Sequence, residues 1–222
     1  MTYGPLPPFE TASGRETVRG DVPGRRDLLA LAGLLLEYPD DELDARRQEA
    51  LAAAQALPDS ESARHLVRFA RWFAAQDADE LRRAYVQTFD HTRRNALYAT
   101  YATYGDTRGR GAALAALREL YAGAGFQARA DELPDYLPTV LEFAAFADDE
   151  SGQVALAQAR PGVEVVARSL RESGSGWASL LDAVLGCLPP ADAPTQHQID
   201  QLVAAGPPVE LVGALREGDD HA

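Results

Sequence analysis

The chain has no lysine, a single cysteine and only four histidines, and each shortage excludes a class of site. One cysteine, Cys187, cannot form an internal disulfide, and we expect it to be a buried, inert thiol. The histidines lie too far apart in the sequence to place two metal ligands on one helix face. The sequence therefore predicts no metal site and no cofactor of the protein's own.

Catalytic motifs are also missing. No nucleophile stands in a recognisable motif with a general base, and no zinc-type ligand cluster appears. The glycine-rich string YGDTRGRG follows a predicted helix rather than a strand, and it lacks the Lys and Ser/Thr of a phosphate-binding loop. We expect a protein that binds a partner and not an enzyme.

The charge is strongly negative and unevenly distributed. The formal net charge is -13, from 34 acidic residues against 21 basic residues, all of them arginine. Residues 131–222 hold 16 acidic residues against 4 arginines, whereas residues 1–130 are nearly balanced. Such a chain is a poor nucleic-acid binder. The acidic part is either a solvated surface, which we favour, or a surface that attracts a basic partner.

Arg25 and Arg26 precede an apolar run that continues to Leu36, an arrangement like a twin-arginine export signal. The run is too short to span a bilayer, and no small-residue cleavage site follows it. We favour a first core helix that ends at Tyr38, because Pro39 disfavours helical geometry in the residue before it. No membrane insertion is expected.

Hydrophobic periodicity predicts an all-α protein, because no segment alternates with period two for long enough to form a strand. Residues 25–188 are expected to form one helical domain. Residues 1–24, rich in proline and glycine, are expected to form a mobile arm. Residues 189–222 are expected to be an acidic linker, up to residue 198, and a tail with one short helix.

Capping residues and helix breakers give the expected boundaries. Asp40 is expected to cap a helix that runs to Leu57, and Asp77 or Asp79 to cap a later one. The Pro161-Gly162 pair is expected to interrupt a helix. The apolar positions of the predicted helices include Leu66, Phe69, Ala70 and Phe73; Leu81, Tyr85 and Phe89; Leu97, Tyr101 and Tyr104; Leu114, Leu117 and Tyr121; and Val140, Leu141 and Phe143.

Polar residues mark two turns between these helices. Within TFDHTRRN, Arg93 and Arg94 either clamp carboxylates of neighbouring helices, which we favour, or contact an anionic ligand. Gly105 suits a helix C-terminus, and Asp106 or Thr107 suits the cap of the helix that carries Arg108 and Arg110. Gly109 and Gly111 are expected to permit close approach of helices. We group the arginines and Asp106 as a structural clamp.

ELPDYLPTVLEF forms an elbow, with two prolines, before a helix that is apolar on more than one face. Glu132 and Asp135 at this elbow either complement the helix N-terminus, the more common use, or meet a basic peptide. A helix that is apolar nearly all round is either central in a bundle or faces a groove that a partner fills.

The strings YVQTFD, RRNALYATYATYGDTRGRG, AGF and ELPDYLPTVLEFAA, in this order, resemble the nitrate reductase assembly chaperones. This is the NarJ or delta subunit family of the broader TorD-like group. The resemblance covers roughly residues 25–150. Many TorD-like relatives carry an Asp-His pair at the elbow where this chain has Asp135 and Tyr136, so a role that needs an imidazole does not transfer.

The resemblance implies a TorD-like helical bundle and a cytoplasmic chaperone. The implied client is the apo catalytic (alpha) subunit of a membrane-bound nitrate reductase, recognised at its N-terminal segment. The implied role is to promote insertion of molybdenum cofactor into the client before it docks on the membrane. Molybdenum cofactor biosynthesis proteins are a further implied class of partner. The alternatives are a structural or accessory subunit of the reductase and a chaperone for another molybdoenzyme.

An apolar groove with an acidic rim is what a basic, partly apolar helical peptide requires. For each aromatic taken singly, a plain core role is the more common use. The residues expected to bind the client peptide are Tyr98, Tyr101, Tyr104, Tyr136, Leu137, Leu141 and Phe143 in the groove and Glu132, Asp135 and Glu142 at the rim.

Overall fold

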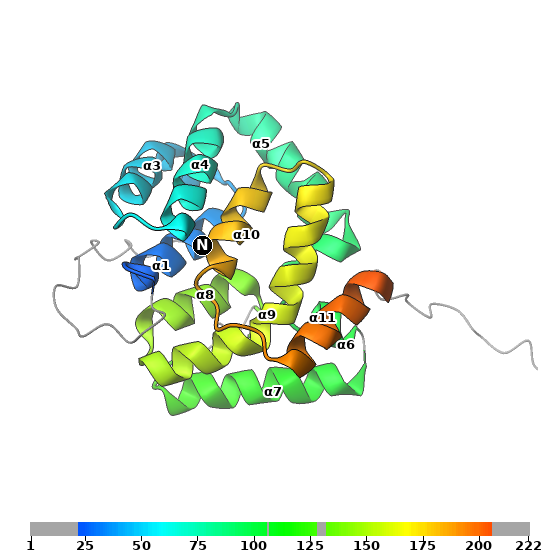
Figure 1. Cartoon of the computed structure of the whole chain (residues 1–222). Coiled ribbons are helices and arrows are strands. Elements are labelled where there is room, and N and C mark those ends of the chain that lie inside the picture. Colours follow the sequence, from blue (N-terminus) through cyan, green and yellow to red (C-terminus); the bar gives the residue numbers. More distant parts are fainter. Residues whose placement is uncertain (1–21, 106, 128–131, 206–222) are drawn as a thin grey trace, which may run out of the picture.

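The computed structural model describes residues 22–105, 107–127 and 132–205, and these residues form a helical bundle (Figure 1). No strand occurs among them, so the prediction of an all-α fold is confirmed. Most of the predicted N-terminal arm and residues 206–222 lie outside the described residues. The helices are α1 (Arg25–Leu36), α2 (Asp41–Ala45), α3 (Arg47–Ala56), α4 (Glu61–Ala75), α5 (Ala78–Tyr85), α6 (Tyr101–Tyr104), α7 (Arg108–Gly123), α8 (Leu137–Phe146), α9 (Asp149–Glu172), α10 (Trp177–Leu185) and α11 (Ala193–Ala205), with a π-helical turn over Val86–Asp90 and a 3-10 turn over Arg93–Asn95.

Helix α1 lies at the centre of the packing and contacts α8, α10, α3 and α4. Five of its leucines are almost completely buried, as the apolar run predicted, and Leu34 is partly buried. Gly33 lets α1 approach α8 closely, because a Cβ added there would lie 3.2 Å from the carbonyl oxygen of Pro138. Arg25 and Arg26 both reach Asp149 at the start of α9, at 3.6 and 2.7 Å. The twin arginines therefore anchor α1 to α9.

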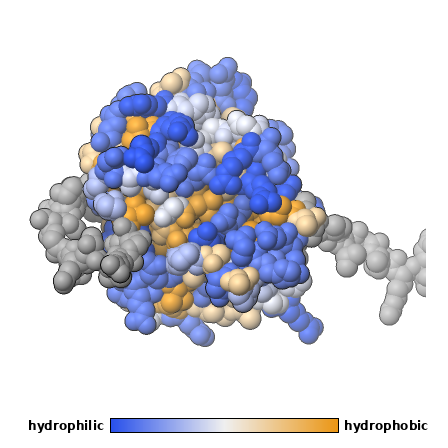
Figure 2. Space-filling view, viewed as in Figure 1, coloured by the Kyte–Doolittle hydropathy of each residue, from blue (hydrophilic) through white to orange (hydrophobic). Residues whose placement is uncertain are grey.

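A second part of the core is aromatic. Trp177 of α10 is 1% exposed and lies against Phe69 of α4 and Phe89 of the π-helical turn, with ring centroids 6.4 and 5.5 Å away. Tyr85 completes this group at 5.9 Å from the Trp177 ring. Hydrophilic surface covers much of the face in Figure 2, and hydrophobic surface forms a band across the middle with smaller areas above and below it, one of them over α3 and α4.

Predicted helix caps are largely confirmed. Asp40 accepts a hydrogen bond from the backbone N–H of Leu43, and Asp77 accepts from Asp79 and Glu80. The helix expected from Asp40 to Leu57 is nevertheless divided at Arg46, whose backbone (φ -102°, ψ 4°) leaves the helical path between α2 and α3.

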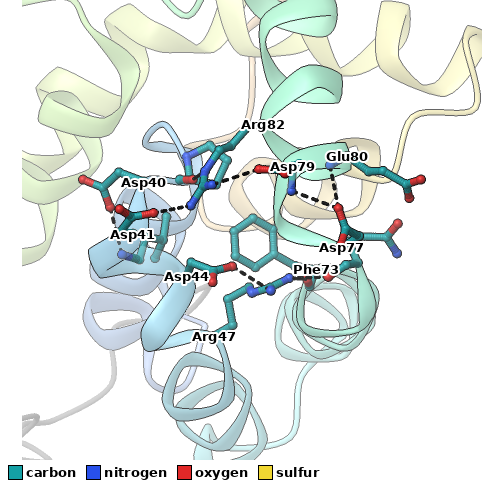
Figure 3. Close-up of polar contacts among 12 residues, drawn as sticks. Asp40, Asp41, Asp44, Arg47, Phe73, Asp77, Asp79, Glu80 and Arg82 are labelled. Carbon is teal, nitrogen blue, oxygen red and sulfur yellow. Dashed lines mark hydrogen bonds and ion pairs between the residues drawn. The ribbon is translucent and has the colours of Figure 1, made fainter.

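Arginine side chains explain this division. Arg47 donates to the carbonyls of Phe73 and Gln76 at the end of α4, at 3.1 and 2.6 Å, and also pairs with Asp44. Arg82 of α5 donates to the carbonyl of Pro39. Figure 3 shows these contacts, with Arg82 also reaching the Asp41 and Asp79 carboxylates. The short helix α2 is therefore tied to α5, while α3 is tied to α4.

Three further predictions were wrong. Leu97 lies in a loop before the one-turn helix α6, because the loop pairs with the elbow described below. Helix α9 continues through Pro161, and its neighbour Gly162 packs against Ala99. Helix α11 begins at Ala193, inside the segment expected to be a linker, because Asp192 caps it. Ile199 of α11 is buried, and α11 contacts α9.

Gly162 is expected to be intolerant of a side chain. A Cβ added there would overlap the carbonyl oxygen of Ala99, so Gly162→Ala should lower the free energy of unfolding by about 1–3 kcal/mol. Gly111→Ala is the matched control, since nothing lies within 4 Å of its Cβ position, and it should stabilise the helix by up to about 1 kcal/mol. Urea unfolding curves measure both. Equal stability of the two variants would contradict this packing.

Gly111 was expected to permit a close approach of helices, and this expectation is wrong because nothing lies within 4 Å of its Cβ position. Gly109 does permit a close approach, because a Cβ there would lie 3.1 Å from the Tyr104 ring.

Candidate functional site

The elbow and the loop before α6 are joined by a short antiparallel backbone bridge between Tyr98 and Tyr136. The N–H of Ala99 donates to the carbonyl of Asp135 at 2.8 Å, and the N–H of Leu137 donates to the carbonyl of Leu97 at 2.7 Å. The bridge places the rings of Tyr98 and Tyr136 5.7 Å apart.

Asp135 is completely buried beside this bridge. One carboxylate oxygen accepts hydrogen bonds from the backbone N–H of Thr100, at 3.2 Å, and from the Thr100 hydroxyl. Arg110 of α7 approaches the same oxygen at 3.4 Å. The other oxygen has no hydrogen-bond partner among the described residues. A buried carboxylate is costly unless it is paired, so Asp135 requires both Thr100 and Arg110 in place.

Arg110 also lies over two tyrosine rings. Its guanidinium carbon is 5.6 Å from the centroid of Tyr98 and 5.3 Å from that of Tyr101. These distances are typical of cation–π contacts. Arg110 thus joins α7 to the loop and to the elbow. We call Tyr98, Thr100, Tyr101, Arg110 and Asp135 the Asp135 cluster.

Two carboxylates accept hydrogen bonds from the paired tyrosines. The Tyr98 hydroxyl donates to Glu132 at 3.3 Å, and the Tyr136 hydroxyl donates to Glu37 at 3.2 Å. All four side chains are partly exposed. We call Glu37, Tyr98, Glu132 and Tyr136 the tyrosine–glutamate surface. It combines two neighbouring aromatic rings with two carboxylates.

The tyrosines of this surface are neutral donors at neutral pH. Burial raises the pKa of Tyr98, and the nearby Glu132 carboxylate raises it further. Burial likewise raises the pKa of Tyr136, with Tyr85 and Glu37 adding to the effect. Because the phenols keep their protons, they donate to the carboxylates and leave the surface net negative.

The structure corrects the expected lining of a groove. Leu137, Leu141 and Phe143 are at most 4% exposed, because α8 is packed between α1 and α9, so they belong to the core. Asp135 is not part of an acidic rim, because its carboxylate is buried against Thr100 and Arg110. Glu132 remains at the surface.

Other expected binding residues lie at or near the surface. Tyr101 is half-buried under Arg110, and Tyr104, 40% exposed, stands at the end of α6. Glu142 is exposed on α8. Glu37 was missed by sequence reasoning, since nothing local distinguishes it and 99 residues separate it from Tyr136.

The expected clamp residues are distributed over several elements. Arg94 lies 3.7 Å from Glu172 at the end of α9, so it joins the 3-10 turn to that helix. Arg93 and Arg108 are exposed, and Arg110 belongs to the Asp135 cluster. Asp106 lies outside the described residues.

Among the described residues, no group of His, Cys, Asp and Glu has the arrangement of a metal site. In the same part of the chain, no helix combines the length and apolar character needed to span a membrane. The described residues therefore define a helical bundle that carries a partly exposed tyrosine–glutamate surface.

The comparison with protein families is consistent with this class. The model of the nitrate reductase delta subunit family matches residues 53–182, and the chain belongs to this family. The TorD-like fold expected from the sequence motifs is thereby confirmed.

Curated relatives share about a third of the aligned residues. The chain is 34% identical over 154 residues to the probable nitrate reductase molybdenum cofactor assembly chaperone NarJ of Bacillus subtilis, covering 69% of this chain and 84% of the relative. It is 32% identical over 160 residues to the chaperone NarJ of Escherichia coli, covering 71% of this chain and 67% of the relative. It also matches the nitrate reductase-like protein NarX of Mycobacterium tuberculosis, at 34% identity, but spans 23% of that protein's length. The family members named as NarJ are chaperones and not catalysts, so the chain is not an enzyme.

Asp135 should be essential for stability. Asp135→Asn keeps the shape but removes the charge that pairs with Arg110, and we expect a loss of about 3 kcal/mol in the free energy of unfolding. Glu132→Gln, at the partly exposed neighbouring carboxylate, should cost less than about 1 kcal/mol. Denaturant unfolding measures both, and equal effects of the two changes would contradict the assigned role of Asp135.

Stability should fall in alkali. The folded-state pKa values of Tyr85, Tyr121 and Tyr136 lie above the ordinary value of 10.0, chiefly because of burial. Above that pH the unfolded chain loses phenolic protons that the folded chain keeps, so the stabilisation is present below pH 10.0 and is lost as pH rises. Unfolding free energies between about pH 9 and pH 11 should decline, and less steeply in Tyr136→Phe. The absorbance of tyrosinate reports the ionisation of these residues. Ionisation with an ordinary pKa while the protein remains folded would contradict this prediction.

Proposed function

We propose that this chain is an assembly chaperone for the catalytic subunit of a respiratory nitrate reductase. It would hold that subunit in a state competent to receive molybdenum cofactor, and delay its docking on the membrane until insertion is complete. Family membership supports this proposal, together with the names of the relatives from Bacillus subtilis and Escherichia coli. The protein would act in the cytoplasm and hold no cofactor of its own.

The tyrosine–glutamate surface is the observation that carries the proposed mode of binding. The expected ligand is the N-terminal segment of the catalytic subunit, a basic and partly apolar helical peptide. The carboxylates of Glu37 and Glu132 would pair with peptide arginine or lysine. The rings of Tyr98 and Tyr136 offer aromatic surface to the same cations and to apolar side chains.

The geometry favours a preorganised surface. The hydroxyl of each tyrosine is held by a carboxylate, and the backbone bridge fixes the separation of the rings. Ordered side chains lose little conformational freedom when a ligand binds. Charge pairs that remain partly exposed at such a surface act mainly through complementarity and association rate, and they are weakened by salt. Binding of the client segment is therefore expected to depend on ionic strength.

Calorimetric titration tests this proposal. A peptide that copies the N-terminal segment of the nitrate reductase catalytic subunit from the same genome should bind with micromolar affinity or better, and more weakly as salt increases. Glu132→Arg should weaken binding at least about tenfold, because it reverses a charge at the surface. Glu119→Arg, an exposed change on α7, is the control with equal charge change and should leave affinity unaltered.

Equal weakening by the two changes would mean that only net charge matters and would remove the tyrosine–glutamate surface from recognition. A role as a structural subunit has a different signature. In that case the chain would be recovered in stoichiometric amount in the mature reductase. A chaperone would be absent from the mature enzyme.

A further inference from the structure

A surface groove of about 570 Å³ lies between α3 and α4, apart from the residues of the tyrosine–glutamate surface. Its apolar lining comes from Ala54 and Leu57 at the end of α3 and from Ala63 and Val67 of α4. Figure 2 shows hydrophobic surface bordered by strongly hydrophilic surface over these two helices. A groove with an apolar lining between two helices has the form that accepts one face of a further helix.

One wall of this groove is a row of arginines. Arg64, Arg68 and Arg71 follow one another at spacings of four and three residues, so they lie on one side of α4 over about 10 Å. Arg64 pairs with Asp59 at 2.7 Å. Arg68 and Arg71 are exposed and form no ion pair among the described residues. In a chain with a net charge of -13, this is a local positive surface.

Among the described residues that line the groove, Asp59 is the one acidic residue, and its charge is opposed by Arg64. The groove therefore carries net positive charge beside apolar surface. That combination repels a basic peptide and attracts an acidic one. The client segment proposed above, being basic, does not fit here.

We propose that this groove binds an amphipathic helix of a partner protein, with an apolar face and a row of Glu or Asp along its flank. The apolar face would pack on Leu57 and Val67, and the acidic flank would pair with Arg68 and Arg71. A small anion such as phosphate fits less well, because the arginines are arranged in a line and not around a point. The chain would then have two surfaces of opposite charge preference.

Fluorescence anisotropy with a synthetic probe tests this inference on the full chain. The probe is a labelled helical peptide with leucines at helical spacing and glutamates along one flank, and the comparison peptide has glutamine in place of every glutamate. We expect saturable binding of the first peptide and at least tenfold weaker binding of the second. Combined Arg68→Glu and Arg71→Glu should weaken binding of the acidic peptide at least tenfold.

Combined Arg118→Glu and Arg168→Glu is the matched control, since both arginines are exposed on other helices, α7 and α9. Circular dichroism confirms that both double variants remain folded. Equal affinity of the groove variant and the control variant would overturn the proposal, as would equal affinity of the two peptides. A loss of self-association on sedimentation, seen only in the groove variant, would assign the groove to a second copy of this chain and also overturn it.

Discussion

The pairing of one buried carboxylate organises the part of the structure that we propose for client binding. Asp135 is completely buried, and its partners come from the loop before α6 and from α7. Since an unpaired buried charge is strongly destabilising, these elements must meet for the chain to fold. Arg110 then lies over Tyr98 and Tyr101, and the backbone bridge sets Tyr98 beside Tyr136. The tyrosine–glutamate surface is a consequence of how this charge is accommodated.

Structural features that depend on residues close together in the sequence were predicted well. Asp40 and Asp77 cap helices because a carboxylate can reach the backbone N–H groups two or three residues ahead, whatever the tertiary fold. The apolar positions of α4 repeat at helical spacing, and Phe69 and Phe73 are buried as that pattern requires. The family motifs also predicted the TorD-like fold, and the match of the family model over residues 53–182 agrees with them.

Contacts between residues far apart in the sequence could not be predicted in this way. Polarity suggested that Asp135 would be exposed, but its burial depends on Arg110, which is 25 residues away in sequence. The apolar helix α8 left open whether Leu141 faces a core or a groove, and only the packing of α1 decides that it is core. Pro161 was expected to end a helix, yet α9 continues, and the adjacent Gly162 packs against Ala99. Glu37 reaches Tyr136 across 99 residues, which no local pattern indicates.

One proposed surface would attract a basic partner and the other an acidic partner. Such a pair of surfaces would suit a chaperone that contacts its client and another protein at the same time. The molybdenum content of the client tests the central proposal most directly. The catalytic subunit should be purified after production with this chain, with its Glu132→Arg variant, and without it. We predict full loading with the wild-type chain, reduced loading with the variant and little loading without the chain. Equal loading in all three preparations would contradict the proposal that this protein is an assembly chaperone.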